Sequence, residues 1–149
     1  MDNAIYFVAA LPIYVASVYA LMHVLTKHEK KHHVRHIFII AGSAVLSWVV
    51  SVYAKDIIAH PRPDLSSALF IPSDPYSFPS GHAAFMFGLA WSMYSFDKHA
   101  GKILFILATV TGIARVLAGV HYWYDIVGGF MLAYFIAYVI HFASRKILA

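Results

Sequence analysis

The sequence has little charge and no cysteine. Of its 149 residues, 12% are Asp, Glu, Lys or Arg, whereas soluble domains carry about 25%. So little charge cannot cover a surface that faces water, and the 61% apolar content is typical of a membrane protein instead. The absence of cysteine excludes disulfide bonds and thiolate chemistry within the chain. The sequence predicts a single membrane domain over residues 1–149.

Long uncharged stretches predict an all-α bundle of about five transmembrane helices. Residues 4–25 carry no charge, which is enough for the roughly 20 residues that a spanning helix needs. No Lys or Arg precedes this stretch, so we expect a retained span rather than a cleaved signal peptide, with a kink at Pro12. Spans in lipid must be helical because their backbone groups can bond only within the segment. The predicted spans are about 4–25, 37–57, 81–96, 103–120 and 123–143.

Most basic side chains gather in three segments outside the predicted spans. The connector 27–36, the polar turn 97–102 and the tail 145–146 hold eight of the eleven Lys and Arg residues. With five spans these segments share one side of the membrane, and the positive-inside rule makes that side cytoplasmic. We therefore expect an inner (cytoplasmic) membrane protein whose N-terminus and proline-rich loop 60–80 face outward and whose C-terminus faces inward. The net charge of +4 then reflects topology, not binding to nucleic acid.

The remaining basic residues lie toward the predicted outer side. A charge at membrane depth is costly and usually marks a function. Counted at about 1.5 Å per helical residue from the nearest cytoplasmic charge, polar residues of four helices lie at depths of roughly 20 to 30 Å: Lys55, His82, Arg115 and Asp125. Cations that converge in a low-dielectric place need an anion. The planar fork of Arg and the point charge of Lys both suit phosphate.

The stretch PSGH, from Pro79 to His82, precedes one of the predicted helices. It has a simple interpretation as a helix start, with Ser80 as N-cap and a histidine at the boundary. It also has a functional interpretation, because the first N–H groups of a helix have no internal partner and bind phosphate. Gly81 would let the backbone approach the anion closely. His82 would then stand beside the anion as a proton donor.

The stretch HYWYD places His121 and Asp125 four residues apart. At that spacing the two side chains share one face if a helix begins near residue 121. A carboxylate bonded to one imidazole nitrogen fixes the tautomer and makes the other nitrogen a better base or nucleophile. Two histidines beside one anion can divide the work, one attacking phosphorus while the other protonates the leaving oxygen.

Three stretches of the chain together resemble a known family. They are KDIIAHPRP (Lys55 to Pro63), PSGH, and ARVLAGVHYWYD (Ala114 to Asp125). They resemble the three signature motifs of the type 2 phosphatidic acid phosphatase superfamily, Lys-x6-Arg-Pro, Pro-Ser-Gly-His and Ser-Arg-x5-His-x3-Asp. Order and internal spacing agree over about half the chain. Ala114 replaces the family Ser and offers no hydroxyl to the phosphate, and family members often have six spans where five are predicted here.

The resemblance implies a membrane enzyme that hydrolyses lipid phosphates without metal or other cofactor. By the same resemblance, His121 is the nucleophile that forms a phosphohistidine, Asp125 orients it, and His82 is the general acid and later the base. The residues implied to bind phosphate are Lys55, Arg62, Ser80, Gly81 and Arg115. An undecaprenyl-diphosphatase-like member fits best, because an outward site suits recycling of a carrier lipid from undecaprenyl diphosphate to undecaprenyl phosphate and inorganic phosphate.

Several alternatives stay open at this point. Within the class, the substrate could be phosphatidylglycerol phosphate, phosphatidic acid or a lipid A phosphate. A metal-binding membrane protein could use His82, His121 and Asp125 as ligands, although the neighbouring cations would repel a metal ion. The chain could also be a lipid-phosphate binder or transporter without catalysis. Haloperoxidases share the site pattern, but they are soluble proteins, whereas this composition is typical of a membrane protein. The expected partners are a lipid phosphate substrate and membrane lipids.

Other histidines support weaker hypotheses. The basic connector carries four that could bind a metal ion, although such connectors are mostly solvated: His28, His32, His33 and His36. His60 and Asp64 lie beside the first motif and could form the rim of a site.

Overall fold

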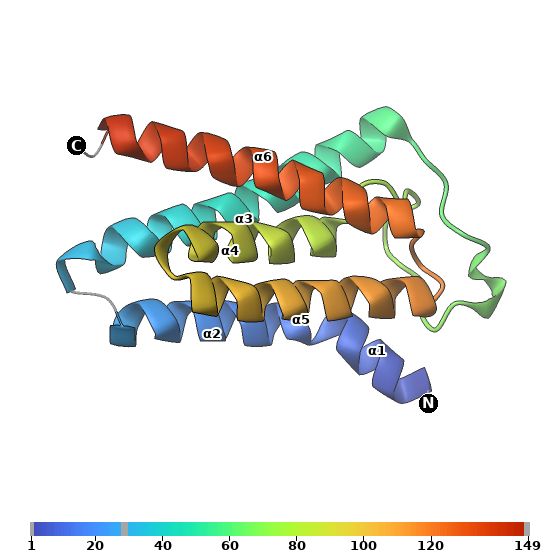
Figure 1. Ribbon diagram of the computed structural model, residues 1–149. Coiled ribbons are helices and arrows are strands. Elements are labelled where there is room, and N and C mark those ends of the chain that lie inside the picture. Colours follow the sequence, from blue (N-terminus) through green and yellow to red (C-terminus); the bar gives the residue numbers. More distant parts are fainter. Residues whose placement is uncertain (1, 28–29, 148–149) are drawn as a thin grey trace.

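A computed structural model describes residues 2–27 and 30–147 as a bundle of helices (Figure 1). Its all-α character confirms the predicted class. The loop over residues 59–80 and the connection between the last two long helices lie at the same end of the bundle. The elements are α1 (Asp2–Ala10), α2 (Pro12–Lys27), α3 (Lys30–Ile58), the short 3-10 helix η1 (Leu65–Ser67), α4 (Gly81–Phe96), α5 (Lys98–Leu117) and α6 (Trp123–Ile147).

Three helices of the described chain are long and apolar enough to cross a membrane: Lys30–Ile58, Lys98–Leu117 and Trp123–Arg145. A fourth span results if Ala4–Ala10 and Pro12–Lys27, which are bent by 45°, count as one. The bend falls where Pro12 occupies the first position of α2, a position that suits proline. The prediction of five spans is not confirmed, because the 16 residues of α4 reach only about 24 Å against a hydrocarbon core of about 30 Å.

The basic connector and the polar turn were predicted to lie outside the helices, but most of each is helical. Residues 30–36 of the basic connector form the start of α3, and residues 98–102 of the polar turn form the start of α5. Asp97 caps α5, since its Oδ1 accepts hydrogen bonds from the backbone N–H groups of His99 at 2.8 Å and Ala100 at 3.1 Å. Hydropathy marks only the part of a helix that lies in lipid, so it misses turns that continue into water.

Helix α4 lies at the centre of the bundle and contacts α2, α3, α5 and α6. Its buried residues occur around the whole helix, as expected of a helix that is apolar on all sides. Small residues allow close packing in the bundle. At Gly88 an added Cβ would lie 2.8 Å from the Cα of Ala44 on α3. Large apolar side chains instead cover the outer surfaces, among them Phe38, Trp48, Ile57, Phe135 and Tyr138.

Candidate active site

One face of α3 directs Lys55 into the bundle. Ser43, Ser47, Ser51 and Lys55 recur every four residues, and each is at most 5% exposed. The three serines leave room for the neighbouring helices, so α3 and α4 pack closely against each other. The Lys55 ammonium therefore reaches the end of the bundle from inside, near the proline-rich loop that follows α3.

The start of α4 brings backbone and hydroxyl groups to the same end. Ser80 is the N-cap, with its Oγ 3.5 Å from the backbone N–H of Ala83. Ser80 and Gly81 are both buried. At Gly129 of α6 an added Cβ would lie 2.9 Å from the Ser80 carbonyl oxygen, so this glycine lets α6 approach the start of α4. The simple interpretation as a helix cap is thus correct for Ser80, and it leaves the adjoining N–H groups available to an anion.

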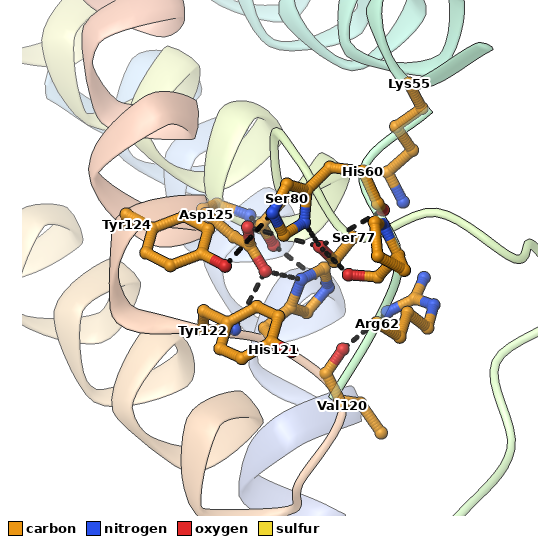
Figure 2. A network of polar contacts seen from close by, with 12 residues as sticks. Lys55, His60, Arg62, Ser77, Ser80, Val120, His121, Tyr122, Tyr124 and Asp125 are labelled. Atoms are coloured by element: carbon orange, nitrogen blue, oxygen red, sulfur yellow. Dashed lines mark hydrogen bonds and ion pairs between the residues drawn. The ribbon is translucent and has the colours of Figure 1, made fainter. Parts of the chain in front are cut away.

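His121 and Asp125 form a buried pair beside Ser80 (Figure 2). The His121 Nδ1 lies 3.0 Å from Asp125 Oδ2, and the backbone N–H of Tyr122 donates to the same oxygen at 2.8 Å. The two side chains are 1% and 0% exposed. Helix α6 begins at Trp123, so His121 precedes the helix instead of opening it. With Nδ1 donating to the carboxylate, Nε2 keeps its lone pair and lies 3.4 Å from the Ser80 Oγ.

The protonation of His121 follows from its surroundings. Burial, together with the positive charges of Arg115 and Arg62, lowers the pKa of His121 from 6.5 to about 4, although the hydrogen bond with Asp125 acts to raise it. At neutral pH the imidazole is therefore uncharged, which is the form that can act as a nucleophile.

The two cations of the first motif share one carboxylate. Lys55 Nζ lies 2.8 Å from Asp74 Oδ2, and Arg62 forms an ion pair with Asp74 Oδ1. Arg62 also donates from Nη1 to the carbonyl oxygen of Val120 at 2.6 Å, directly before His121. This bond links the proline-rich loop to the segment that carries the histidine (Figure 2).

Arg115 and His82 complete the set of residues that the sequence singled out. Arg115 is 5% exposed, donates from Nη1 to the Ala9 carbonyl oxygen at 3.2 Å, and lies with its guanidinium 5.6 Å from the centre of the Phe70 ring. Its Nε is buried without a hydrogen-bond partner in the described chain. His82, in the first turn of α4, lies within electrostatic range of Arg115 and His121.

Ser77, which the sequence did not assign to the site, supports Asp125. The Ser77 hydroxyl lies 3.4 Å from Asp125 Oδ1 and 3.1 Å from the Pro61 carbonyl oxygen. His60 follows, with Nδ1 3.1 Å from Ser77 Oγ and Nε2 3.3 Å from the Tyr124 hydroxyl. His60, considered as a rim residue, is half-buried and lies between Ser77 and Tyr124 in this chain of contacts (Figure 2). In the sequence, the one signal that points to Ser77 is its position two residues before the PSGH motif.

The histidines of the basic segment do not form a metal site in the part of the chain described. His32 and His36 stack at 5.8 Å between ring centroids, and His28 lies outside the described residues. No three His, Asp or Glu side chains within residues 2–27 and 30–147 come together in a way that could hold a metal ion. That finding covers His82, His121 and Asp125 as well.

A family model described as the PAP2 superfamily matches residues 32–148, and the chain belongs to that superfamily. The match covers most of the bundle and all of the site described above. Together with the apolar helices, it identifies the chain as an integral membrane protein of a family of lipid phosphatases.

Two curated relatives and two solved structures are similar to the chain. The bacitracin transport permease protein BcrC of Bacillus licheniformis is 23% identical over 155 residues, covering 99% of this chain and 73% of the relative. Phosphatidylglycerophosphatase B of Bacillus subtilis is 30% identical over 104 residues, covering 62% of this chain and 50% of the relative. This chain therefore spans about half the length of the second relative.

The solved structures share the fold. The crystal structure of LpxE from Aquifex aeolicus has a TM-score of 0.74 at 24% identity, covering 94% of this chain and 84% of that one. The crystal structure of a transmembrane PAP2-type phosphatidylglycerolphosphate phosphatase from Bacillus subtilis has a TM-score of 0.66 at 19% identity, covering 98% of this chain and 77% of that one.

Proposed function

We propose that the chain is a lipid phosphatase that works through a phosphohistidine on His121. The observation that carries this proposal is the buried pair in which Asp125 holds Nδ1 of His121 at 3.0 Å and leaves Nε2 beside the start of α4. A neutral imidazole with a fixed tautomer, next to buried cations and free helix N–H groups, suits nucleophilic attack on phosphorus.

The phosphate is held by groups that carry positive charge or free N–H donors. Lys55, Arg62 and Arg115 neutralise its oxygens, and the start of α4 contributes the backbone N–H of Gly81 and the hydroxyl of Ser80. The backbone N–H of Ser80 is already bonded to the Asp125 carbonyl oxygen at 3.0 Å. These interactions strengthen as charge builds up on the equatorial oxygens during transfer, so they stabilise the transition state more than the ground state.

The reaction proceeds in two steps. His121 Nε2 attacks phosphorus, a phosphorus–nitrogen bond forms and the bond to the leaving oxygen breaks. His82, which gains a proton when the negatively charged phosphate binds beside it, gives that proton to the leaving oxygen. Water then attacks the phosphohistidine, His82 takes a proton from the water, and the phosphorus–nitrogen bond breaks to release inorganic phosphate. His121 returns to its neutral form and His82 to its protonated form.

The favoured substrate is a polyprenyl diphosphate such as undecaprenyl diphosphate. The predicted orientation supports it, because an outward-facing site matches the side on which a carrier lipid is released. Phosphatidylglycerol phosphate is the second candidate, favoured by the 30% identity to a relative named for that activity. Phosphatidic acid and lipid A phosphates complete the panel to be assayed.

The orientation itself is part of the proposal, with the site outside and the C-terminus inside. The chain has no cysteine, so single-cysteine variants can be labelled without background. Ser67 in the loop and Ser95 near the far end of α4 are both exposed and outside the site. A membrane-impermeant maleimide applied to intact cells should label Ser67→Cys and spare Ser95→Cys. The opposite pattern would reverse the orientation.

The deciding experiment measures phosphate release from lipid mono- and diphosphates by purified protein, with EDTA present. We expect turnover of at least one lipid by the wild type and none by His121→Ala. His99→Ala removes an exposed histidine outside the site and serves as the matched control. An inert wild type across the panel would overturn the proposal.

A lipid-phosphate binder or transporter is the second candidate, because one relative is named a transport permease. A quench in alkaline denaturant, applied to the protein with a radiolabelled lipid phosphate, separates the two functions. A phosphatase yields an acid-labile phosphoryl-protein, whereas a binder retains the lipid intact.

A further inference from the structure

The first-motif cations already have an anion in this structure. Both oxygens of the Asp74 carboxylate are engaged, Oδ2 with Lys55 Nζ at 2.8 Å and Oδ1 with Arg62. The Nε of Arg62 also donates to the backbone carbonyl oxygen of Asp74 at 3.0 Å. Two cations assigned to the substrate phosphate are therefore bridged by one side chain of the chain itself.

The exposed fractions of Lys55, Arg62 and Asp74 show that the carboxylate contacts the cations from the solvent side. The side chains of Lys55 and Arg62 are 7% and 4% exposed, whereas the Asp74 side chain is 47% exposed. Its negative charge also acts on His82 and Arg115, the other groups at this end of the bundle. Asp74 thus covers two buried cations from the solvent side, as an incoming phosphate would.

Asp74 is ionised at neutral pH. Burial acts to raise its pKa, but the hydrogen bonds and positive charges of Lys55 and Arg62 outweigh burial and hold the pKa below its ordinary value. A phosphate and the Asp74 carboxylate are both anions, so they compete for the same cations.

The part of the loop that carries Asp74 lies between two attachments. Leu69 donates its N–H to the Ala118 carbonyl oxygen at 3.1 Å, and Ser77 donates its N–H to the His60 carbonyl oxygen at 2.9 Å. Residues 70–76 lie between these bonds, and Tyr76 pairs with Pro61 as an isolated bridge. A change confined to this short segment would withdraw the carboxylate and leave His121 and Asp125 in place.

We propose that Asp74 is an internal anion that occupies part of the phosphate site, is displaced by substrate, and selects for phosphate groups with more than one negative charge. This inference rests on the proposed lipid phosphatase function. It assigns a specificity-determining role to a residue that lies outside the three motifs.

The selectivity follows from charge. A phosphomonoester, or the terminal phosphate of a diphosphate, carries up to two charges and three free oxygens, so it outcompetes a carboxylate with one charge and two oxygens. A phosphodiester head group carries one charge and two free oxygens, which gives it no such advantage. Asp74 is part of the same chain as the two cations, so its effective concentration beside them is high and it competes well with a phosphodiester. Phosphodiester lipids of the surrounding bilayer are thereby kept out of the site.

The test compares wild type with Asp74→Asn, which keeps the shape and removes the charge. Inorganic phosphate should bind the variant about fivefold or more tightly, as expected when one partly exposed ion-pair competitor is lost. The KM for the lipid phosphate should fall while kcat changes little. Phosphatidylglycerol in mixed micelles should inhibit the variant and leave the wild type nearly unaffected.

Two further variants make the comparison sharp. Asp64→Asn removes the same charge from the same loop, but the Asp64 carboxylate bonds Ser66 and not the cations, so it should behave as wild type. Asp74→Glu restores the charge and should restore weak phosphate binding. Equal phosphate affinity in wild type and Asp74→Asn, or a higher KM and lower kcat in that variant, would overturn the proposal.

The test also separates this inference from the proposed function. Binding of inorganic phosphate is measured by titration calorimetry and needs no turnover. If the wild type proves inert but Asp74→Asn gains phosphate affinity, the phosphatase proposal fails and the displaced anion stands. If the wild type turns over a lipid phosphate but Asp74→Asn binds inorganic phosphate no more tightly, the phosphatase proposal stands and the displaced anion fails.

Discussion

Asp125 Oδ2 receives two hydrogen bonds at once, from His121 Nδ1 at 3.0 Å and from the Tyr122 backbone N–H at 2.8 Å. The N–H bond ties the carboxylate to the segment just before α6, so the imidazole is oriented by a group that cannot rotate away. Both side chains are buried, which strengthens the interaction by excluding water.

Replacing Asp125 by Asn should lower kcat by about 100-fold or more, because the amide no longer fixes the tautomer that frees Nε2. Substrate KM should change much less, since the phosphate is held by other residues. The measurement is steady-state phosphate release in detergent. Asp56→Asn removes an exposed carboxylate of α3 and should leave kcat as it is. A similar fall in both variants would count against the orienting role.

The sequence was sufficient to identify the helices and the residues that form this pair, but not their contacts. Spacing of four residues indicated that His121 and Asp125 could meet on a helix, yet the contact forms with His121 ahead of α6, where the Tyr122 N–H also reaches the carboxylate. Hydropathy located the lipid-facing parts of α3 and α5 and missed their charged first turns. The ends of those helices depend on caps such as Asp97, which hydropathy does not register.

The partners of the first-motif cations could not be predicted at all. Asp74 lies 19 residues beyond Lys55 in a proline-rich loop, and no periodicity relates the two positions. Loop contacts of this kind depend on the three-dimensional path of the chain between its attachments. The same holds for Ser77, whose contact with Asp125 joins residues 48 positions apart.

Removing the Ser77 hydroxyl should lower kcat by about tenfold, because Asp125 Oδ1 loses a neighbour that helps to orient it. Ser77 acts through Asp125 and so is a positioning residue. A positioning role predicts that kcat falls while the KM for the lipid phosphate stays near the wild-type value. Ser66→Ala, which removes a loop hydroxyl bonded to Asp64, is the matched control. A raised KM with unchanged kcat would show that Ser77 serves substrate binding instead.

Acidification should destabilise the fold through His121. The folded-state pKa is about 4, below the ordinary value of 6.5, so between these values the unfolded chain binds more protons than the folded one. The stability that His121 contributes is therefore complete above pH 6.5 and is lost as the pH falls toward 4.

Thermal unfolding in detergent checks this at pH 7 and pH 5. Between pH 7 and pH 5 the melting temperature of the wild type should fall by several degrees more than that of His121→Gln. One pKa unit corresponds to about 1.4 kcal/mol, and 1 kcal/mol shifts the melting temperature by about 2–4 °C in a domain of this size. Glutamine does not titrate in this range, so parallel shifts in both proteins would contradict a depressed pKa at His121.

Gly129 should tolerate no side chain, because it sets the distance between α6 and the start of α4. An added Cβ would lie 2.8 Å from Ala83 Cβ and 2.9 Å from both the Ser80 carbonyl oxygen and the Ala84 backbone nitrogen. Gly129→Ala should therefore destabilise the protein by about 1–3 kcal/mol through overpacking, despite the gain in helix propensity.

The same variant should also lower activity, since separating the two helices moves Ser80 away from His121 Nε2. Gly42→Ala is the matched control, because nothing lies within 4 Å of a Cβ added there. That control should be neutral or up to about 1 kcal/mol more stable, through helix propensity alone. Thermal midpoints and phosphate release measured on both variants decide the matter. Equal stability of the two would mean that α6 can shift without cost and that Gly129 does not position the site.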